Sequence, residues 1–303
     1  MISASRSWPP IAILAALLVT GGALAGVPPV SMSLSMPRLA APGLRAALER
    51  SPDDPDLHVR LGIAMAKLGY FGDALACFQF SLGSTEYERL GLLYHADTLS
   101  TLGRHAEAAQ LRREELALHQ SPLAELLTRV GLVDDLRSMG DPSLDREVWA
   151  LIAAFPDGAT AWATLAETHM DRGELEEAAT ALALPTPPRV SARVWQARAR
   201  LAALEGDPIG AEALLLEGLE QNRSAEAIVE DLAELRLSEG DPWGALDLLE
   251  MPRFGEPERP RWLAAEARAL AATGASEAAC ERLGRLRAVY PSDPTRLEPC
   301  GLP

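Results

Sequence analysis

The chain has 303 residues and a formal net charge of −15 at pH 7. A surface with this excess of carboxylates repels a phosphate backbone, which excludes nucleic acid as the expected partner. Only 5% of the residues are aromatic, and alanine and leucine dominate the apolar ones, a composition that favours all-helical packing of small aliphatic side chains.

Residues 1–25 have the features of a secretory signal peptide. Arg6 lies in a short basic region, an apolar stretch follows over residues 11–19, and Ala23-Leu24-Ala25 fits a signal-peptidase cleavage site. An uncleaved membrane anchor is the alternative, although Gly21-Gly22 interrupts the apolar run, which is short for a membrane span. We therefore expect an exported protein, periplasmic or secreted, which contacts a membrane only through this segment if it stays uncleaved.

Two short segments follow. Residues 26–38 are rich in proline and serine, which predicts an extended linker. A helix is expected over residues 39–52, where Leu44 and Ala47 fall at positions of the second helix of a hairpin. We interpret this helix as half a repeat that caps the array behind it.

A recurrent glycine divides residues 53–291 into units of similar length. Successive separations between these glycines are 34, 37, 33, 33, 34 and 34 residues. The glycines are Gly69, Gly103, Gly140, Gly173, Gly206, Gly240 and Gly274. On both sides of Gly173 apolar residues recur at helical spacing, which predicts two helices joined by a tight turn. A single hairpin cannot bury its apolar face alone, so the units must stack.

The positions after the glycine carry a family resemblance. An alanine stands five residues after six of the seven glycines, and the exception is Asp145 in the third unit. The pattern resembles the tetratricopeptide repeat (TPR), which has a period of 34 residues. The best-matching units hold Leu61, Gly62, Gly69, Ala74 and Phe78, and Trp162, Leu165, Ala166, Gly173 and Ala178.

The resemblance implies an all-α fold, a right-handed α-solenoid of about seven TPR-like hairpins plus the N-terminal half-repeat. The expected units lie near residues 55–88, 89–122, 126–158, 159–191, 192–225, 226–259 and 260–291, and a C-terminal tail spans residues 292–303.

Three of the turns share the sequence Gly-Asp-Pro, beginning at Gly140, Gly206 and Gly240. In each we expect aspartate to be the N-cap of the second helix and proline its first residue. The third unit is irregular, because Asp145 replaces the small alanine, and we expect looser packing there.

No pattern for chemistry stands out in the sequence. The five histidines lack metal-binding spacing, and no nucleotide-binding loop or nucleophile motif is present. Carboxylate pairs such as Asp134-Asp135 are interpreted as parts of a solvated helix face. We therefore predict no catalytic residues, no metal, no cofactor and no enzymatic activity.

The resemblance also implies a concave groove, lined by the first helix of each unit, that binds a peptide or helix of a partner protein. Carried over by register, the groove residues are Ile63, Lys67, Asp97, Asp134, Thr160, Glu167, Met170, Asp171, Arg193, Arg200, Glu230, Glu234, Arg261 and Arg268. This groove would be acidic through its middle and mixed with arginine toward its C-terminal end, which favours a partner with basic segments. A solvated inner wall without a ligand is the alternative.

One binding mode of the family is disfavoured. A clamp for a C-terminal carboxylate uses lysine and asparagine, whereas this chain has one lysine in the groove, Lys67, and one asparagine outside it, Asn222. The leading function is a non-enzymatic interaction scaffold of the periplasm or cell exterior. The alternative is a membrane-tethered subunit of an envelope assembly or secretion system.

The chain has three cysteines, and an oxidising compartment would pair those within reach. Cys77 lies in the first unit and Cys280 in the seventh, while Cys300 lies in the tail. The tail is long enough to fold back over the last helix, so we predict a Cys280–Cys300 disulfide and a lone, partly buried Cys77. Two unpaired cysteines and a disordered tail are the alternative.

Overall fold

The computed structural model describes residue 27 and residues 30–80, 88–118, 121–183, 190–222, 225–251, 260–289 and 300. These residues form helices and no β-strand, which confirms the predicted all-α class. None of the described helices is both long enough and apolar enough to span a bilayer. The signal-peptide prediction for residues 1–25 falls outside the described residues.

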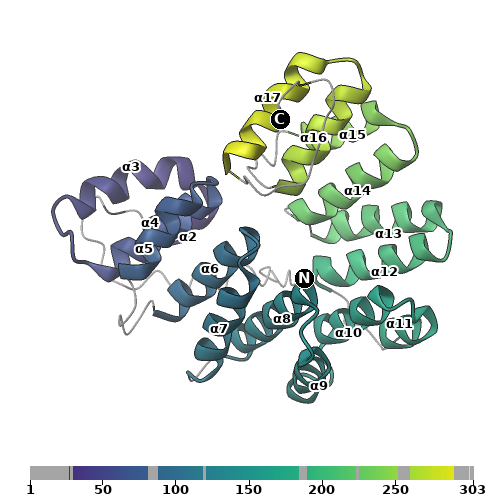
Figure 1. Cartoon of the computed structure of the whole chain (residues 1–303), viewed down its shortest axis with the longest axis horizontal. Helices are drawn as coiled ribbons and strands as arrows, with labels where there is room; N and C mark the ends of the chain where they lie inside the picture. Colours follow the sequence, from purple (N-terminus) through teal and green to yellow (C-terminus); the bar gives the residue numbers. More distant parts are fainter. Residues whose placement is uncertain are drawn as a thin grey trace, which may run out of the picture. The chain divides into compact units, whose positions relative to one another are not determined.

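The chain divides into two compact units, residues 1–98 and 99–303, with the boundary inside helix α6 (Glu88–Thr101). The first unit also contains α2 (Val30–Ser35), α3 (Pro37–Leu48), α4 (Pro55–Lys67) and α5 (Phe71–Phe80) (Figure 1). Its apolar core is formed mainly by α3, α4 and α5, where side chains such as Leu44, Ile63 and Phe78 are fully buried.

The prediction of an extended linker over residues 26–38 is wrong for much of that segment. Residues 30–35 form α2, and α3 begins at Pro37, where a helix needs no backbone donor. Helix α2 lies beside α4, and Val30 is buried in the core of the first unit. Burial of that apolar side stabilises a short helix that local composition does not favour.

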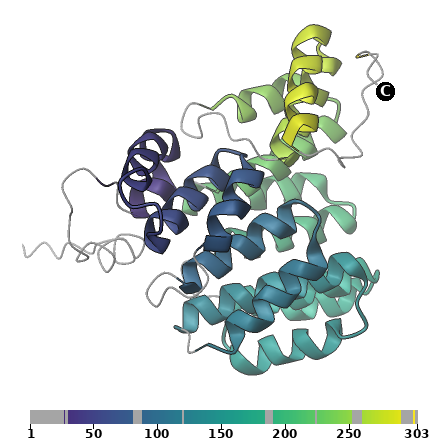
Figure 2. The same ribbon diagram turned by 60° about the vertical axis from the view of Figure 1, so that its left-hand side comes forward.

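The second unit is a stack of helical hairpins, and each hairpin is formed by two consecutive helices of the chain. Its helices are α7 (His105–Leu116), α8 (Pro122–Met139), α9 (Leu144–Ala154), α10 (Ala159–Asp171), α11 (Leu175–Leu182), α12 (Ala192–Leu204), α13 (Pro208–Gln221), α14 (Glu226–Ser238), α15 (Pro242–Leu249), α16 (Pro260–Ala272) and α17 (Ser276–Val289). Figures 1 and 2 show α12 to α17, in green to yellow, as successive hairpins side by side. One apolar core runs from α8 to α16, as expected for stacked repeats.

The glycine and alanine positions that the sequence singled out form the turns and the closest helix contacts. All seven recurrent glycines have positive φ, between 62° and 86°, and no other described residue has a positive φ. This is the left-handed conformation that favours glycine at the end of a helix. The alanines five residues later, including Ala74 and Ala178, are at most 2% exposed.

The Gly-Asp-Pro turns differ from one another. Asp207 and Asp241 cap their helices as predicted, accepting hydrogen bonds from the backbone N–H of Gly210 and Gly244 at 2.8 and 2.9 Å. Asp141 does not cap α9. It accepts hydrogen bonds from the backbone N and Oγ of Ser143, at 2.8 and 2.6 Å.

As a consequence of that turn, α9 begins at Leu144, two residues later in the register than α13 or α15. Asp145 therefore does not occupy the close helix contact that the sequence predicted. Its side chain is 64% exposed and forms an ion pair with Arg172. The buried residues of α9 are Val148, Leu151 and Ile152 instead.

The structure contains the predicted bond between Cys280 in α17 and Cys300, with their Cα atoms 5.4 Å apart. Cys77 in α5 is a half-buried free thiol. The tail residues between Tyr290 and Pro299 lie outside the described part of the chain.

Candidate functional site

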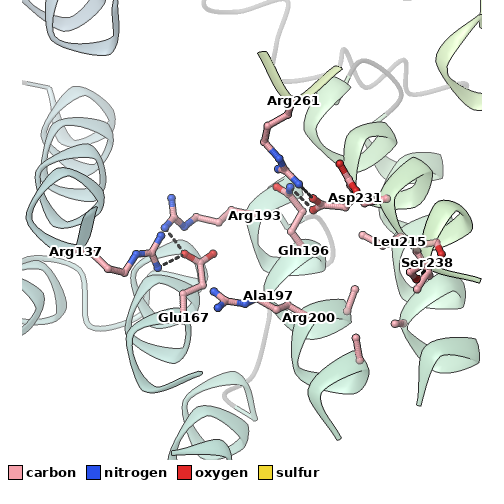
Figure 3. Close-up of a pocket in the computed structure, with 15 residues that line it drawn as sticks. Arg137, Glu167, Arg193, Gln196, Ala197, Arg200, Leu215, Asp231, Ser238 and Arg261 are labelled. Carbon is pink, nitrogen blue, oxygen red and sulfur yellow. Dashed lines mark hydrogen bonds and ion pairs between the residues drawn. The ribbon is translucent and has the colours of Figure 1, made fainter. Parts of the chain in front are cut away.

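A cavity of about 750 Å³ opens in the second unit between α12, α13 and α14 (Figure 3). Small and apolar side chains line part of it, among them Ala197 and Ala203 of α12 and Leu215 of α13. The alanines on α12 leave space that larger side chains would fill. The charged lining residues are Arg137, Glu167, Arg193, Arg200, Asp231, Glu234 and Arg261.

One ion-pair network joins three consecutive first helices, α8, α10 and α12. Arg193 of α12 donates to both carboxylate oxygens of Asp134 at 2.7 and 2.8 Å and also pairs with Glu167. Arg137 of α8 donates to Asp134 at 3.0 Å and to Glu167 at 2.9 Å. Figure 3 shows Arg137 and Arg193 meeting at Glu167.

The same network continues to the end of α10. Arg200 of α12 donates to Asp171 at 2.5 Å, and the Nε of Arg137 lies 3.4 Å from the same carboxylate. Each of the three carboxylates on α8 and α10 thus has guanidinium partners on a neighbouring helix.

A second network joins α14 and α16. Arg261 donates to Asp231 at 2.6 Å and lies 3.7 Å from the carboxylate of Glu230, while Arg268 pairs with Glu234. Between the two networks the contact is made by a neutral amide. The Nε2 of Gln196 donates to Asp231 at 2.7 Å and to the carbonyl of Ala227 at 3.2 Å (Figure 3).

The carboxylates hold the groove arginines in their charged form. Burial would lower the pKa of Arg193, but Asp134 and Glu167 raise it more, so the net pKa lies above the ordinary value. The pKa of Arg261 is likewise lowered by burial and raised more strongly by Asp231 and Glu230. The cavity therefore presents fixed positive charge at any physiological pH.

The structure places the predicted groove residues in three different settings. Asp134, Glu167, Asp171, Arg193 and Arg200 come together in the first network, and Glu234, Arg261 and Arg268 in the second. Glu230 also belongs to the second network, where its buried carboxylate lies 3.7 Å from Arg261. The remaining predicted residues lie elsewhere: Ile63 and Met170 are buried, Lys67 and Asp97 are exposed in the first unit, and the Thr160 hydroxyl hydrogen-bonds Ser191 at 2.9 Å.

Sequence reasoning missed Arg137, Gln196 and Asp231. Arg137 follows Asp134 by three residues, the spacing at which side chains meet on one helix face, and this signal could have identified it. Arg137, Arg193 and Arg200 lie among the carboxylates of the first network. The middle of the groove therefore carries mixed charge and not the acidic surface expected from the sequence. The cavity itself is lined by four arginines and three carboxylates.

A separate charged cluster is buried between α7 and α8. Asp135 accepts hydrogen bonds from Arg112 Nε at 2.9 Å and Ser100 Oγ at 2.7 Å, and lies 2.9 Å from Nδ1 of His105. The interpretation of Asp135 as part of a solvated face is therefore wrong, since its side chain is only 2% exposed. Gly131 leaves room for the guanidinium, because a Cβ there would lie 2.3 Å from Cζ of Arg112.

A second cavity, of about 470 Å³, lies between α10 and α11 and is lined by residues that include Trp162, His169, Glu176 and Glu177. The indole N–H of Trp162 donates to the carbonyl of Pro156 at 2.7 Å. Nδ1 of His169 lies 2.6 Å from Glu174. Among the described residues, no group of histidine, cysteine and carboxylate side chains is arranged to hold a metal ion.

Comparison with known proteins identifies the fold. No family model matches the sequence, and no curated protein matches it. The crystal structure of the APC/C hetero-tetramer Cut9-Hcn1 matches with a TM-score of 0.51 and 14% identity, over 82% of this chain and 47% of that one. The chain has a tetratricopeptide-repeat fold. It spans about half the length of that matched chain.

Two bacterial proteins match less closely. A tetratricopeptide repeat protein from Parabacteroides merdae gives a TM-score of 0.47 at 13% identity, over 78% of this chain and 93% of that one. A TPR protein from Thermus thermophilus gives 0.43 at 22% identity, over 73% and 99%. At these identities the likeness concerns the TPR fold and not the function.

Proposed function

We propose that the chain is a non-enzymatic scaffold that binds a peptide or helix of a partner protein along α8, α10, α12, α14 and α16. The observation that carries this proposal is the 750 Å³ cavity beside two ion-pair networks that run across consecutive first helices. Charged side chains that already hold one another in place lose little conformational freedom when a ligand arrives. Preformed helices that present such side chains suit the recognition of an extended or helical segment.

The sequence favoured a partner with basic segments. That expectation depended on Asp134, Glu167 and Asp171, each of which contacts an arginine of the chain itself. The carboxylates are therefore not the groups with the most spare binding capacity. Nucleic acid stays excluded because of the net charge.

Export to the periplasm or the cell exterior is part of the proposal. It is supported by the signal-peptide features of residues 1–25 and by the Cys280–Cys300 disulfide, which an oxidising compartment favours. A membrane-tethered subunit of an envelope assembly is the second candidate. The mass of the mature protein separates them, since loss of residues 1–25 is expected for the exported scaffold and retention for the tethered subunit.

The groove is tested by filling it. Ala203 lines the cavity from an exposed position, so Ala203→Trp should fill the space without disturbing the core. Ala213, exposed on α13 and outside the cavity lining, gives the matched control Ala213→Trp. After crosslinking in the native cell, Ala203→Trp should lose the partner that the parent chain and Ala213→Trp retain. Equal recovery in all three proteins would refute binding in this groove.

A further inference from the structure

We infer that the partner segment in this cavity is acidic and that Arg200 and Arg261 bind its side-chain carboxylates. This inference rests on the proposed function and adds the charge of the ligand. It opposes what the net charge of −15 suggests, because it depends on which groups in the cavity still face solvent.

All three carboxylates of the cavity are paired with arginines; Glu234 is 32% exposed and pairs with Arg268, and the other two are more shielded. The side chain of Glu167 is 11% exposed and contacts two arginines. Asp231 is 24% exposed and accepts hydrogen bonds from both Arg261 and Gln196. A basic ligand at Glu167 would have to displace Arg137 and Arg193, whose side chains are 23% and 21% exposed, and it would leave their largely buried charge without a counter-ion.

The arginines at the edge of the cavity are more available. Arg200 and Arg261 have side chains that are 45% and 54% exposed, about twice the value for Asp231. A guanidinium carries five N–H donors, and one or two of these are used in the ion pairs of Arg200 and of Arg261. The spare capacity of the cavity therefore consists of donors, which suit a carboxylate in bidentate geometry.

The apolar part of the lining adds a second requirement. Ala203 and Leu215 line the same cavity, so an apolar side chain of the ligand has apolar surface to contact there. The expected ligand is an acidic segment with at least one apolar residue. Repulsion by the acidic surface outside the cavity is weak, because salt at physiological concentration screens exposed charges that are more than about 8 Å apart.

Selection from a display library of random twelve-residue peptides tests the inference with the full-length mature chain. We expect the enriched peptides to be acidic. A synthetic copy of one enriched peptide is then titrated, by fluorescence anisotropy, against the parent chain and the double variant Arg200→Gln/Arg261→Gln. The double variant should bind at least tenfold more weakly.

The matched control is Arg104→Gln/Arg146→Gln, which removes two exposed arginines that are paired with glutamates and lie outside the cavity lining. This control should bind within twofold of the parent, and circular dichroism should show unchanged helix content in both variants. Equal weakening by the two double variants would mean that only general charge matters, and it would overturn the inference.

The remaining outcomes separate this inference from the proposed function. If the enriched peptides are basic or neutral and Ala203→Trp abolishes their binding, the acidic ligand is refuted and the groove proposal stays intact. Acidic peptides that bind Arg200→Gln/Arg261→Gln normally would overturn the assignment of the two arginines. Peptides that bind Ala203→Trp as well as the parent, or no enrichment at all, would count against both proposals.

Discussion

Two sets of ion pairs in the second unit are formed by the same residue types, arginine and aspartate, but one set is buried and the other is exposed to solvent. The Arg112–Asp135 pair between α7 and α8 has side chains 4% and 2% exposed, whereas the Arg200–Asp171 pair in the groove has side chains 45% and 35% exposed. Removing one partner of a buried pair leaves an uncompensated charge in a medium that solvates it poorly, while an exposed charge regains water. Breaking the first pair should therefore destabilise the fold. The second pair can open at little cost, as the proposed binding of a partner requires.

The largest expected effect comes from breaking the buried pair. Asp135→Ala removes the acceptor for Arg112, Ser100 and His105 together, and it should lower the free energy of unfolding by about 3–5 kcal/mol. Denaturant unfolding followed by circular dichroism measures this change. The double variant Arg112→Met/Asp135→Leu should recover most of the loss, because no buried charge remains. A loss below about 1 kcal/mol for Asp135→Ala would mean that the cluster is hydrated like the groove pairs.

A smaller effect should follow from crowding the same pair. In Gly131→Ala the new methyl group would meet the Arg112 guanidinium, and overpacking of this kind costs about 1–3 kcal/mol. Gly284 in α17 gives the control, because a Cβ there meets nothing within 4 Å. Gly284→Ala should stabilise the chain by about 0.5–1 kcal/mol through helix propensity. Opposite shifts in unfolding midpoint are expected, and equal shifts would contradict the role of Gly131.

The repeat architecture could be predicted because each of its structural requirements selects one residue type at one position. A turn that needs positive φ selects glycine at one position, and a close helix contact selects alanine five residues later, as at Gly173 and Ala178. The right-handed sense of the superhelix stays a prediction. Helix α2 was missed because its stability depends on contact with α4, which lies some twenty residues away in the sequence.

The charged sites were harder to predict because they depend on pairs. Arg112 and Asp135 are 23 residues apart, and neither looks buried until the two helices meet. Most residues predicted for the groove lie on helices that line the cavity, but not always on the face that lines it. Neighbouring residues on a helix point about 100° apart, so Glu230 is buried while Asp231 lines the cavity.

Removing an exposed groove pair should change stability very little. Arg268→Gln breaks the pair with Glu234, in which the side chains are 40% and 32% exposed. Exposed pairs of this kind contribute about 0–1 kcal/mol, so the unfolding midpoint should shift by no more than about a third of the shift for Asp135→Ala. A shift comparable to that of Asp135→Ala would erase the distinction between the two sets.

The last prediction concerns Cys77, a half-buried ionisable group in the first unit, and it has the smallest consequence at neutral pH. Burial and, to a smaller extent, the nearby carboxylate of Asp73 raise the pKa of this thiol, Arg45 lowers it in part, and the net pKa is about 11. The thiol should therefore stay protonated at pH 8, and because the other cysteines are bonded to each other, it is the single thiol that can react. Alkylation by iodoacetamide at pH 8 should be at least about tenfold slower in the folded chain than in denaturant.

The pH dependence of stability follows from the same pKa. The pKa of the folded state lies above the ordinary value of 9.0, so the stability that the neutral thiol contributes is present below pH 9 and is lost as the pH rises through 11. Relative to Cys77→Ala, the parent chain should lose stability between pH 9 and 11, a difference in which shared titrations such as that of Tyr94 cancel. Alkylation at pH 8 as fast as in denaturant, or parallel stability curves above pH 9, would show that Cys77 is solvated.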